Sequence, residues 1–168
     1  LGAIRNNNIS LLKKVGIDVG CDSIGDFNQA KAMSNFFNNL NSEGVLANSI
    51  VYNLNPSMNE VFASMIGNFS SSKVSMQFGT AWWYLDQKDG MENQINTLSN
   101  LGVLSKFIGM LTDSRSFLSF PRHEYFRRII CNMIGKDIKD GLLPNDTVFF
   151  GKMIQDICYN NAQNFFKF

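Results

Sequence analysis

The sequence predicts an α/β fold in which parallel strands are covered by helices. Short apolar runs alternate with segments whose apolar residues recur at helical spacing. Polar residues follow the apolar runs directly, as is typical of strands that end at a binding edge. The 168 residues suit one domain, residues 1–168, with a sizeable core. Four strand–helix units fit either one half of an eightfold barrel or a small open sheet.

Four apolar runs are the strand candidates, because each is short and bounded by turn residues. They are Leu1–Ile4, Ser49–Tyr52, Val74–Phe78 and Phe107–Thr112. Residues 5–26, which follow the first run, are rich in Asn and Gly and are predicted to form a polar loop.

Helices are expected between and after these runs, where apolar residues recur every three or four positions. Gly44 and Gly102 are typical helix stops, and Pro56 suits the first turn of the helix that follows it. The expected helices cover residues 30–40, 56–65, 91–101, 126–134 and 150–165, and the last two are additional C-terminal helices.

Charge and hydropathy argue against two classes of partner. The formal net charge is +1, so no basic excess drives binding to nucleic acid. No apolar run approaches the ~18 residues of a membrane span. The three cysteines are odd in number and irregularly spaced, which argues against a disulfide framework and favours a reducing, cytoplasmic location. The start at Leu1, without an initiator Met, reads like the middle of a longer protein.

Candidate functional residues follow the predicted strands, because ligands of parallel α/β folds bind beyond the carboxyl ends of the strands. Polar residues also end strands simply to make turns, so this pattern alone leaves both interpretations open. The residues concerned are Arg5 after the first strand, Asn53 and Asn55 after the second, Trp82, Trp83 and Asp86 after the third, and Asp113 and Arg115 after the fourth.

Asp113 and Arg115 have the side chains best suited to chemistry. A carboxylate at a strand end can ligate a metal or shuttle a proton, but it can equally accept backbone hydrogen bonds in a turn or helix cap. Arg115 can form a bidentate pair with a substrate carboxylate, or a salt bridge with a neighbouring acid. Spacing alone does not separate these alternatives.

The aromatic and histidine candidates are ambiguous in the same way. Trp82 and Trp83 can exclude water from a pocket or pack on a sugar ring, or they can anchor a long loop. Asp86, in the same loop, is interpreted as structural. His123 is the only histidine and is interpreted as structural in the first turn of a helix, because a conventional zinc site needs several N or S ligands.

Long strings along the chain resemble the uronate (glucuronate) isomerase family, in order and over essentially the whole length. Strings of this length are more specific than any single short motif. They are residues 3–8 (AIRNNN), 22–26 (DSIGD), 52–56 (YNLNP), 65–69 (MIGNF), 77–79 (QFG), 82–83 (WW), 86–90 (DQKDG), 109–117 (GMLTDSRSF), 122–128 (RHEYFRR), 155–158 (QDIC) and 160–162 (NNA).

The resemblance implies an amidohydrolase-like (β/α)₈ barrel, of which this chain would be the C-terminal half. It implies interconversion of D-glucuronate with D-fructuronate and of D-galacturonate with D-tagaturonate. It also implies a divalent metal, usually zinc, bound by a His-x-His pair and by an Asp that Asp113 matches. Arg115 matches the active-site Arg of the same string. Arg5 and the Trp82–Trp83 pair match positions at the rim of the substrate pocket.

The chain departs from the family because the His-x-His pair and the rest of the first half of the barrel are absent. A half barrel exposes two sheet edges, so it is expected to pair, either as a homo-oligomer or with the remainder of its own chain. The isolated 168 residues are expected to lack metal and activity. The alternative function is a non-catalytic half barrel that only binds or assembles. The matching strings disfavour a hydrolase of the same superfamily.

Overall fold

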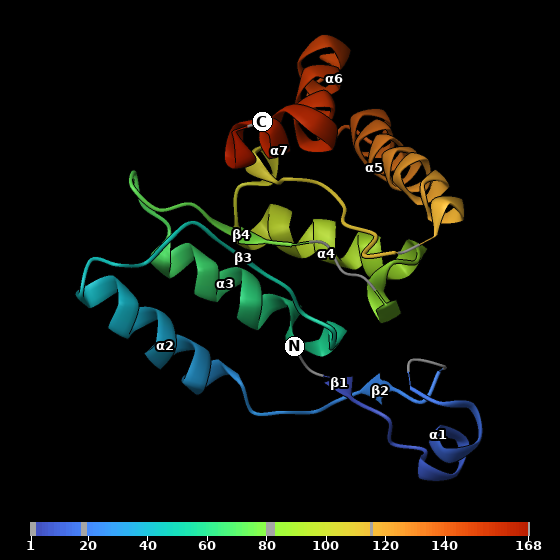
Figure 1. The fold of residues 1–168 in the computed structure, drawn as a ribbon. Helices are drawn as coiled ribbons and strands as arrows, with labels where there is room; N and C mark the ends of the chain where they lie inside the picture. The colour runs from blue at the N-terminus through green and yellow to red at the C-terminus, as the bar shows by residue number, and fades with distance from the viewer. Residues whose placement is uncertain (1–2, 18–19, 80–82, 115, 168) are drawn as a thin grey trace.

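The structure is a computed structural model that describes residues 3–17, 20–79, 83–114 and 116–167. Helices α2, α3 and α4 lie side by side against a short pair of parallel strands, β3 and β4 (Figure 1). The C-terminal helices α5, α6 and α7 gather beyond α4, and a small unit of β1, α1 and β2 extends beyond α2. The chain is therefore a mixed α/β fold with a parallel sheet, as predicted.

The parallel pair confirms two of the predicted strands, each shorter than expected. β3 (Ser49–Val51) and β4 (Met76–Phe78) pair in register, with Val51 opposite Phe78. The Gly79 N–H extends the ladder by donating to the Val51 carbonyl at 2.9 Å. Met76 and Phe78 are buried whereas Gln77 is half-buried, so the two faces of the strand differ.

The helices that cover this pair begin and end close to the predicted positions. Pro56 opens a short 3-10 turn ahead of α3, and Gly44, with φ +70°, follows α2 as a stop. The Gly102 N–H caps α4 through the Leu98 carbonyl. The elements are α2 (Ala30–Ser42), η1 (Pro56–Met58), α3 (Asn59–Phe69), η2 (Trp83–Leu85) and α4 (Lys88–Leu101).

The core fills the space between these helices, the strands and α5. Phe78 of β4 packs on Phe62 of α3 with ring centroids 6.2 Å apart, and Phe107 meets Phe126 of α5 edge-on. Because these rings are almost fully buried, each contributes roughly 1.5–3 kcal/mol through removal of apolar surface from water. The core therefore joins the parallel pair to the surrounding helices.

The N-terminal segment corrects two expectations. Ala3–Ile4 (β1) pairs with Ser23–Ile24 (β2) in an antiparallel, not a parallel, arrangement, and residues 1–2 lie outside the described part. The expected polar loop contains a helix, α1 (Ile9–Val15). Asn8 begins this helix, because its side chain accepts a hydrogen bond from the Leu11 N–H at 2.9 Å. Because Asn8 follows two other asparagines, it did not stand out in the sequence as an N-cap.

The fourth predicted strand, Phe107–Thr112, is wrong, because the segment is extended but forms no ladder. Gly109 interrupts the run with φ +79°, where a strand cannot continue. The Phe107 carbonyl accepts a hydrogen bond from the Asn161 side-chain amide at 2.8 Å instead of from a strand. The apolar composition thus predicted the burial of Phe107 correctly. It did not predict strand pairing, because pairing requires the edge of a neighbouring strand.

The C-terminal region is helical, as predicted. Among the residues that the structure describes, no helix is long and apolar enough to cross a membrane. Phe126, Ile130 and Ile157 are buried and tie these helices to the core. The elements are η3 (Leu104–Lys106), η4 (Phe117–Ser119), α5 (Pro121–Lys139), α6 (Thr147–Gln155), the π-helical turn η5 (Asp156–Asn160) and α7 (Asn161–Phe166).

Candidate functional site at the carboxyl ends of the parallel strands

The carboxyl ends of β3 and β4 are marked by Tyr52 and Gly79, the residues that directly follow the two strands. Side chains alternate between the faces of a strand. Since Phe78 points to α3, Gly79 faces the opposite side, and Tyr52 lies over it. A Cβ on Gly79 would lie 2.6 Å from Cζ of Tyr52, so the phenol ring rests on the Gly79 backbone. This arrangement needs glycine at position 79.

Asp113, a predicted catalytic residue, lies close enough to Tyr52 for its charge to act on the phenol. Its backbone has φ +46°, a left-handed conformation that costs a non-glycine residue free energy. The side chain is exposed, and its carboxylate makes no hydrogen bond or ion pair with any residue that the structure describes. The alternative interpretation, a carboxylate that caps a helix or closes a turn, finds no partner in that part of the chain.

Tyr52 and Asp113 interact electrostatically. Partial burial raises the pKa of the Tyr52 phenol, and the negative charge of Asp113 raises this pKa further. The Tyr52 hydroxyl makes no hydrogen bond with the residues described. The Asp113 charge thus lies within electrostatic range of the phenol that follows β3.

Arg5 belongs to a second polar group, beside β1. Its guanidinium forms an ion pair with Asp22 at 2.9 Å, and Asp22 also accepts a hydrogen bond from the Asn6 N–H at 2.7 Å. Burial and the Asp22 charge raise the pKa of Tyr84, while Arg5 opposes this shift. About half of the Arg5 side chain is exposed, which leaves its outer face open to solvent. Sequence reasoning missed Asp22 and Tyr84, although Asp22 stands in one of the matching strings.

Three of the predicted site residues cannot be placed. Arg115 and Trp82 lie outside the described residues. Trp83 opens the η2 turn, and its side chain is likewise outside the described part. Their assignments remain predictions.

Asn53 and Asn55, the polar residues after β3, have a structural role. Asn53 is buried, and its amide donates to the Asn55 carbonyl at 2.6 Å and to Asn59 Oδ1 at 2.8 Å. Asn55 donates to the Gly25 carbonyl at 3.0 Å and accepts from the Ser57 N–H. This network fixes the turn from β3 into α3 and ties it to the segment after β2.

Asp86 has a structural contact, as interpreted from the sequence, whereas the interpretation of His123 stays a prediction. Asp86 forms an ion pair with Arg122 of α5. His123 is exposed in the first turn of α5, where partial burial and the charges of Arg127 and Arg122 lower its pKa. Among the described residues, no three His, Cys, Asp or Glu side chains gather closely enough to hold a metal ion. Asp113 is therefore at most one ligand of such a site.

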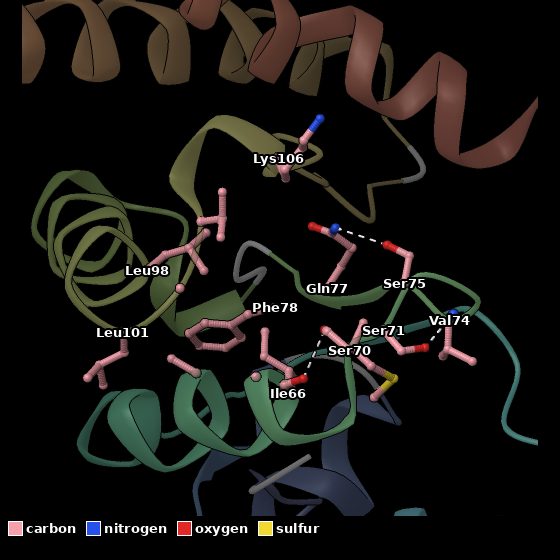
Figure 2. Close-up of a pocket in the computed structure, with 15 residues that line it drawn as sticks. Ile66, Ser70, Ser71, Val74, Ser75, Gln77, Phe78, Leu98, Leu101 and Lys106 are labelled. Atoms are coloured by element: carbon pink, nitrogen blue, oxygen red, sulfur yellow. Dashed lines mark hydrogen bonds between the residues drawn. The ribbon is translucent and has the colours of Figure 1, made fainter. Parts of the chain in front are cut away.

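Two cavities border the parallel pair, one at each of its outer edges. A cavity of about 700 Å³ lies between α2 and residues 49–52 of the β3 edge. A second, of about 410 Å³, lies between α3, α4, the β4 edge and Lys106, and is lined by Phe78, Ile66 and Leu98 (Figure 2). Several of its polar groups already have partners, such as the Gln77 amide, which donates to Ser75. The second cavity lies at the amino end of β4, away from Asp113.

Comparison with known proteins gives consistent matches. The family model described as glucuronate isomerase matches residues 1–166. The uronate isomerase of Flavobacterium johnsoniae is 59% identical over 170 residues, which cover 100% of this chain and 36% of the relative. That of Bacteroides thetaiotaomicron is also 59% identical, with 99% and 36% covered. The crystal structure of the Thermotoga maritima uronate isomerase superposes with a TM-score of 0.85 at 30% identity, and 98% of this chain covers 35% of that one. The chain thus spans about 36% of the length of the curated relatives it matches.

Proposed function

Because the chain belongs to the glucuronate isomerase family, we propose that it forms the C-terminal part of an enzyme that interconverts aldose and ketose uronates. The substrates would be small hexuronates: D-glucuronate, converted to D-fructuronate, and D-galacturonate, converted to D-tagaturonate. The observation that carries this proposal is the Asp113 carboxylate, which has a left-handed backbone and acts electrostatically on Tyr52, the residue that follows β3. Such strain is common at functional sites.

The reaction moves a proton between adjacent carbons. A base removes the proton from C2, the electron pair forms a C1–C2 double bond, and negative charge develops on the C1 oxygen. The C1 oxygen then takes up the proton of the C2 hydroxyl, and the base returns its proton to C1 as the C2 carbonyl forms, which gives the ketose. Because the carbon acid is weak, the developing charge needs preorganised donors and the base must lie within hydrogen-bond reach.

The residues of this chain divide these tasks. Asp113 would act as the proton shuttle or as a metal ligand. Arg115 would stabilise the developing oxyanion or hold the substrate carboxylate. Arg5 would add positive potential for an anionic substrate, and its ion pair with Asp22 reduces this contribution. Trp82 and Trp83 would shape the pocket and exclude water.

We extend the proposal to a divalent metal, for which zinc is the usual family ion. The described residues do not make such a site, since Asp113 is a single carboxylate and no cluster of three ligand side chains accompanies it. The remaining ligands would come from the rest of a full-length isomerase. The proposal locates this enzyme in the cytoplasm, which agrees with the free thiols of Cys21, Cys131 and Cys158.

The proposed architecture is a (β/α)₈ barrel of which this chain supplies the C-terminal half. The cavities at both outer edges of the β3–β4 pair support it, because a closed barrel would fill each edge with a neighbouring strand.

A non-catalytic role is the second candidate. It is favoured by the short coverage of the relatives and by the lack of a metal-ligand cluster among the described residues. In this case the chain would only bind or assemble. Turnover of a full-length protein that carries this sequence separates the two proposals.

Asp113→Asn in a full-length isomerase with this C-terminal part tests the catalytic role. We expect kcat to fall by about 10²–10⁴-fold, because the amide neither takes up a proton nor carries the charge of a carboxylate. Steady-state kinetics with D-glucuronate is the measurement. Asp140→Asn, at an exposed position after α5, is the matched control and should keep normal turnover. Near-normal turnover of Asp113→Asn would rule out the assignment.

A further inference from the structure

The Asp22 carboxylate binds both of the residues that directly follow β1. Its Oδ2 pairs with Nε of Arg5 at 2.9 Å, and its Oδ1 accepts a hydrogen bond from the Asn6 N–H at 2.7 Å. Asn6 has φ +50°, a left-handed conformation that asparagine adopts more readily than most residues, so the chain turns directly after Arg5. Each carboxylate oxygen thus has a partner, one on a side chain and one on the backbone.

The two members of the ion pair differ in their exposure. The Asp22 side chain is 14% exposed, whereas the Arg5 side chain is 49% exposed. The hydrogen bond from the backbone of Asn6 fixes the carboxylate, and the ion pair at Nε then restrains the longer arginine side chain. Solvent, and hence a solute, still reaches about half of that side chain.

The strand pair that carries these residues is tied to the turn after β3. β1 ends directly before Arg5, and β2, its antiparallel partner, begins directly after Asp22. The Gly25 carbonyl, directly after β2, accepts a hydrogen bond from the Asn55 side chain in the turn after β3 at 3.0 Å. The ion pair is therefore held next to a segment that leaves the carboxyl end of the parallel sheet.

We propose that Asp22 is a positioning residue that holds the Arg5 guanidinium in one orientation for an anionic substrate. This inference rests on the proposed function, in which Arg5 helps to bind a uronate. Asp22 acts through Arg5 and does not contact the substrate. Its negative charge lowers the positive potential at Arg5, so what it contributes is the orientation of a planar group that recognises anions by directed hydrogen bonds.

Asp22→Asn in a full-length isomerase with this C-terminal part removes the charge and keeps the shape of the side chain. The Asn oxygen can still accept from the Asn6 N–H, so the turn after β1 is preserved. We expect KM for D-glucuronate to rise about 10- to 100-fold while kcat changes much less, because a misplaced guanidinium binds ground state and transition state more weakly alike. An unchanged KM would overturn the inference. A lower KM would also overturn it, because Asp22 would then only neutralise Arg5.

Ser23→Ala is the matched control in the same strand pair. It removes the hydrogen bond that the Asn7 side chain donates to Ser23 Oγ at 2.6 Å and leaves Arg5 and Asp22 unchanged. We expect kcat and KM to equal those of the parent. If KM rises as much in Ser23→Ala as in Asp22→Asn, general loosening of the β1–β2 pair explains both effects and the inference is overturned.

Arg5→Met tests whether Asp22 acts through Arg5. Asp22→Asn should raise KM in the parent but should not raise it further in the Arg5→Met background, because the side chain that Asp22 positions is already gone. Additive rises in KM would overturn the inference.

Asp22→Glu is a second variant at the same position. It keeps the charge but moves the carboxylate by one methylene group, so the guanidinium is displaced and KM should rise by a smaller factor than in Asp22→Asn. If Asp22→Asn does not fold, Asp22→Glu decides, and an unchanged KM of this variant overturns the inference.

The proposed function and this inference fail in different ways. If the full-length parent converts D-glucuronate and Asp22→Asn has a normal KM, the proposed function stands and only the role of Asp22 falls. If the parent converts neither D-glucuronate nor D-galacturonate, the proposed function falls and this inference falls with it.

Discussion

The polar side chains discussed above differ most in whether they have a hydrogen-bond partner among the described residues. Asn53 is buried and bonded to Asn55 and Asn59, and a buried amide left without partners would cost about 1–3 kcal/mol. Asp113 and the Tyr52 hydroxyl make no such bond with the described residues, and water reaches both side chains. The first kind of residue maintains the turn. The second kind is available for chemistry.

Cysteine reactivity is a testable consequence at this scale. Burial, and to a lesser extent nearby Cys131, raise the pKa of Cys158 to about 11. At pH 8 only about one Cys158 thiol in a thousand is the reactive thiolate. We expect iodoacetamide to modify the exposed Cys131 well before Cys158, as measured by peptide mass mapping over time. In denaturant the two should react alike. Equal rates in the folded protein would contradict the burial of Cys158.

The segment after η3 shows how an element depends on one backbone angle. Gly109 has φ +79°, and a Cβ there would lie 2.6 Å from the Ile157 carbonyl oxygen of the π-helical turn. The chain passes so close to η5 that a side chain has no room. Gly109 thus both ends the extended run and permits the contact between this segment and the C-terminal helices.

Gly109→Ala tests this contact. We expect it to lower the free energy of unfolding by about 1–3 kcal/mol, because alanine is strained at positive φ and its methyl group meets backbone. Urea denaturation of the variant and the parent is the measurement. Gly151→Ala in α6 is the matched control, since its Cβ meets nothing within 4 Å and a helical Gly-to-Ala change is neutral or stabilising. Equal stability of the two variants would refute the close approach.

Helix positions were the most predictable elements, because their signals are local. Pro56, Gly44 and Gly102 mark helix ends through the chemistry of one residue, and each prediction is confirmed. Strand pairing was less predictable. Phe107–Thr112 has the composition of a strand, but whether it pairs depends on an edge far along the chain. The pairing of Ile4 with Ser23 also joins residues far apart along the chain, and the periodicity of the sequence does not predict it.

The candidate site was predictable only in part. Asp113 stood out because it follows an apolar run, and its side chain is exposed, but its catalytic role stays a prediction. Asn53 follows its strand in the same way but is buried in a turn, so position alone did not distinguish the two. Asp22 was missed as a site residue, because its ion pair with Arg5 exists only after folding.

In the described part of the molecule, the parallel sheet consists of β3 and β4 with helices packed against it. Such a pair is marginal by itself, because parallel sheets are normally buried on both faces. The larger cavity, about 700 Å³, runs along β3 and contains Ile50 and Val51 at the unpaired edge. This open edge is a surface that another part of a barrel would cover.

Complementation is the prediction at this scale. The 18.9 kDa chain mixed with the remaining part of a full-length uronate isomerase should form a one-to-one complex, because the strands of the proposed barrel would fill both edges. Light scattering after gel filtration measures the mass. Ile50→Lys should weaken the complex by placing a charge at the β3 edge, whereas Ser72→Lys, in an exposed loop, should not. If the 18.9 kDa chain stays monomeric in the presence of the other part, the proposed barrel is contradicted.

The hydrogen bonds of Asn53 also have a consequence in time. Their acceptors lie two and six residues further along the chain, so the turn needs almost no loop closure, which for ten residues takes about 10–100 ns. The β3–β4 pair must close a loop that includes all of α3 and therefore forms later. The turn after β3 can thus form before the two strands pair. The backbone direction after Tyr52 is then already fixed when Tyr52 reaches Gly79.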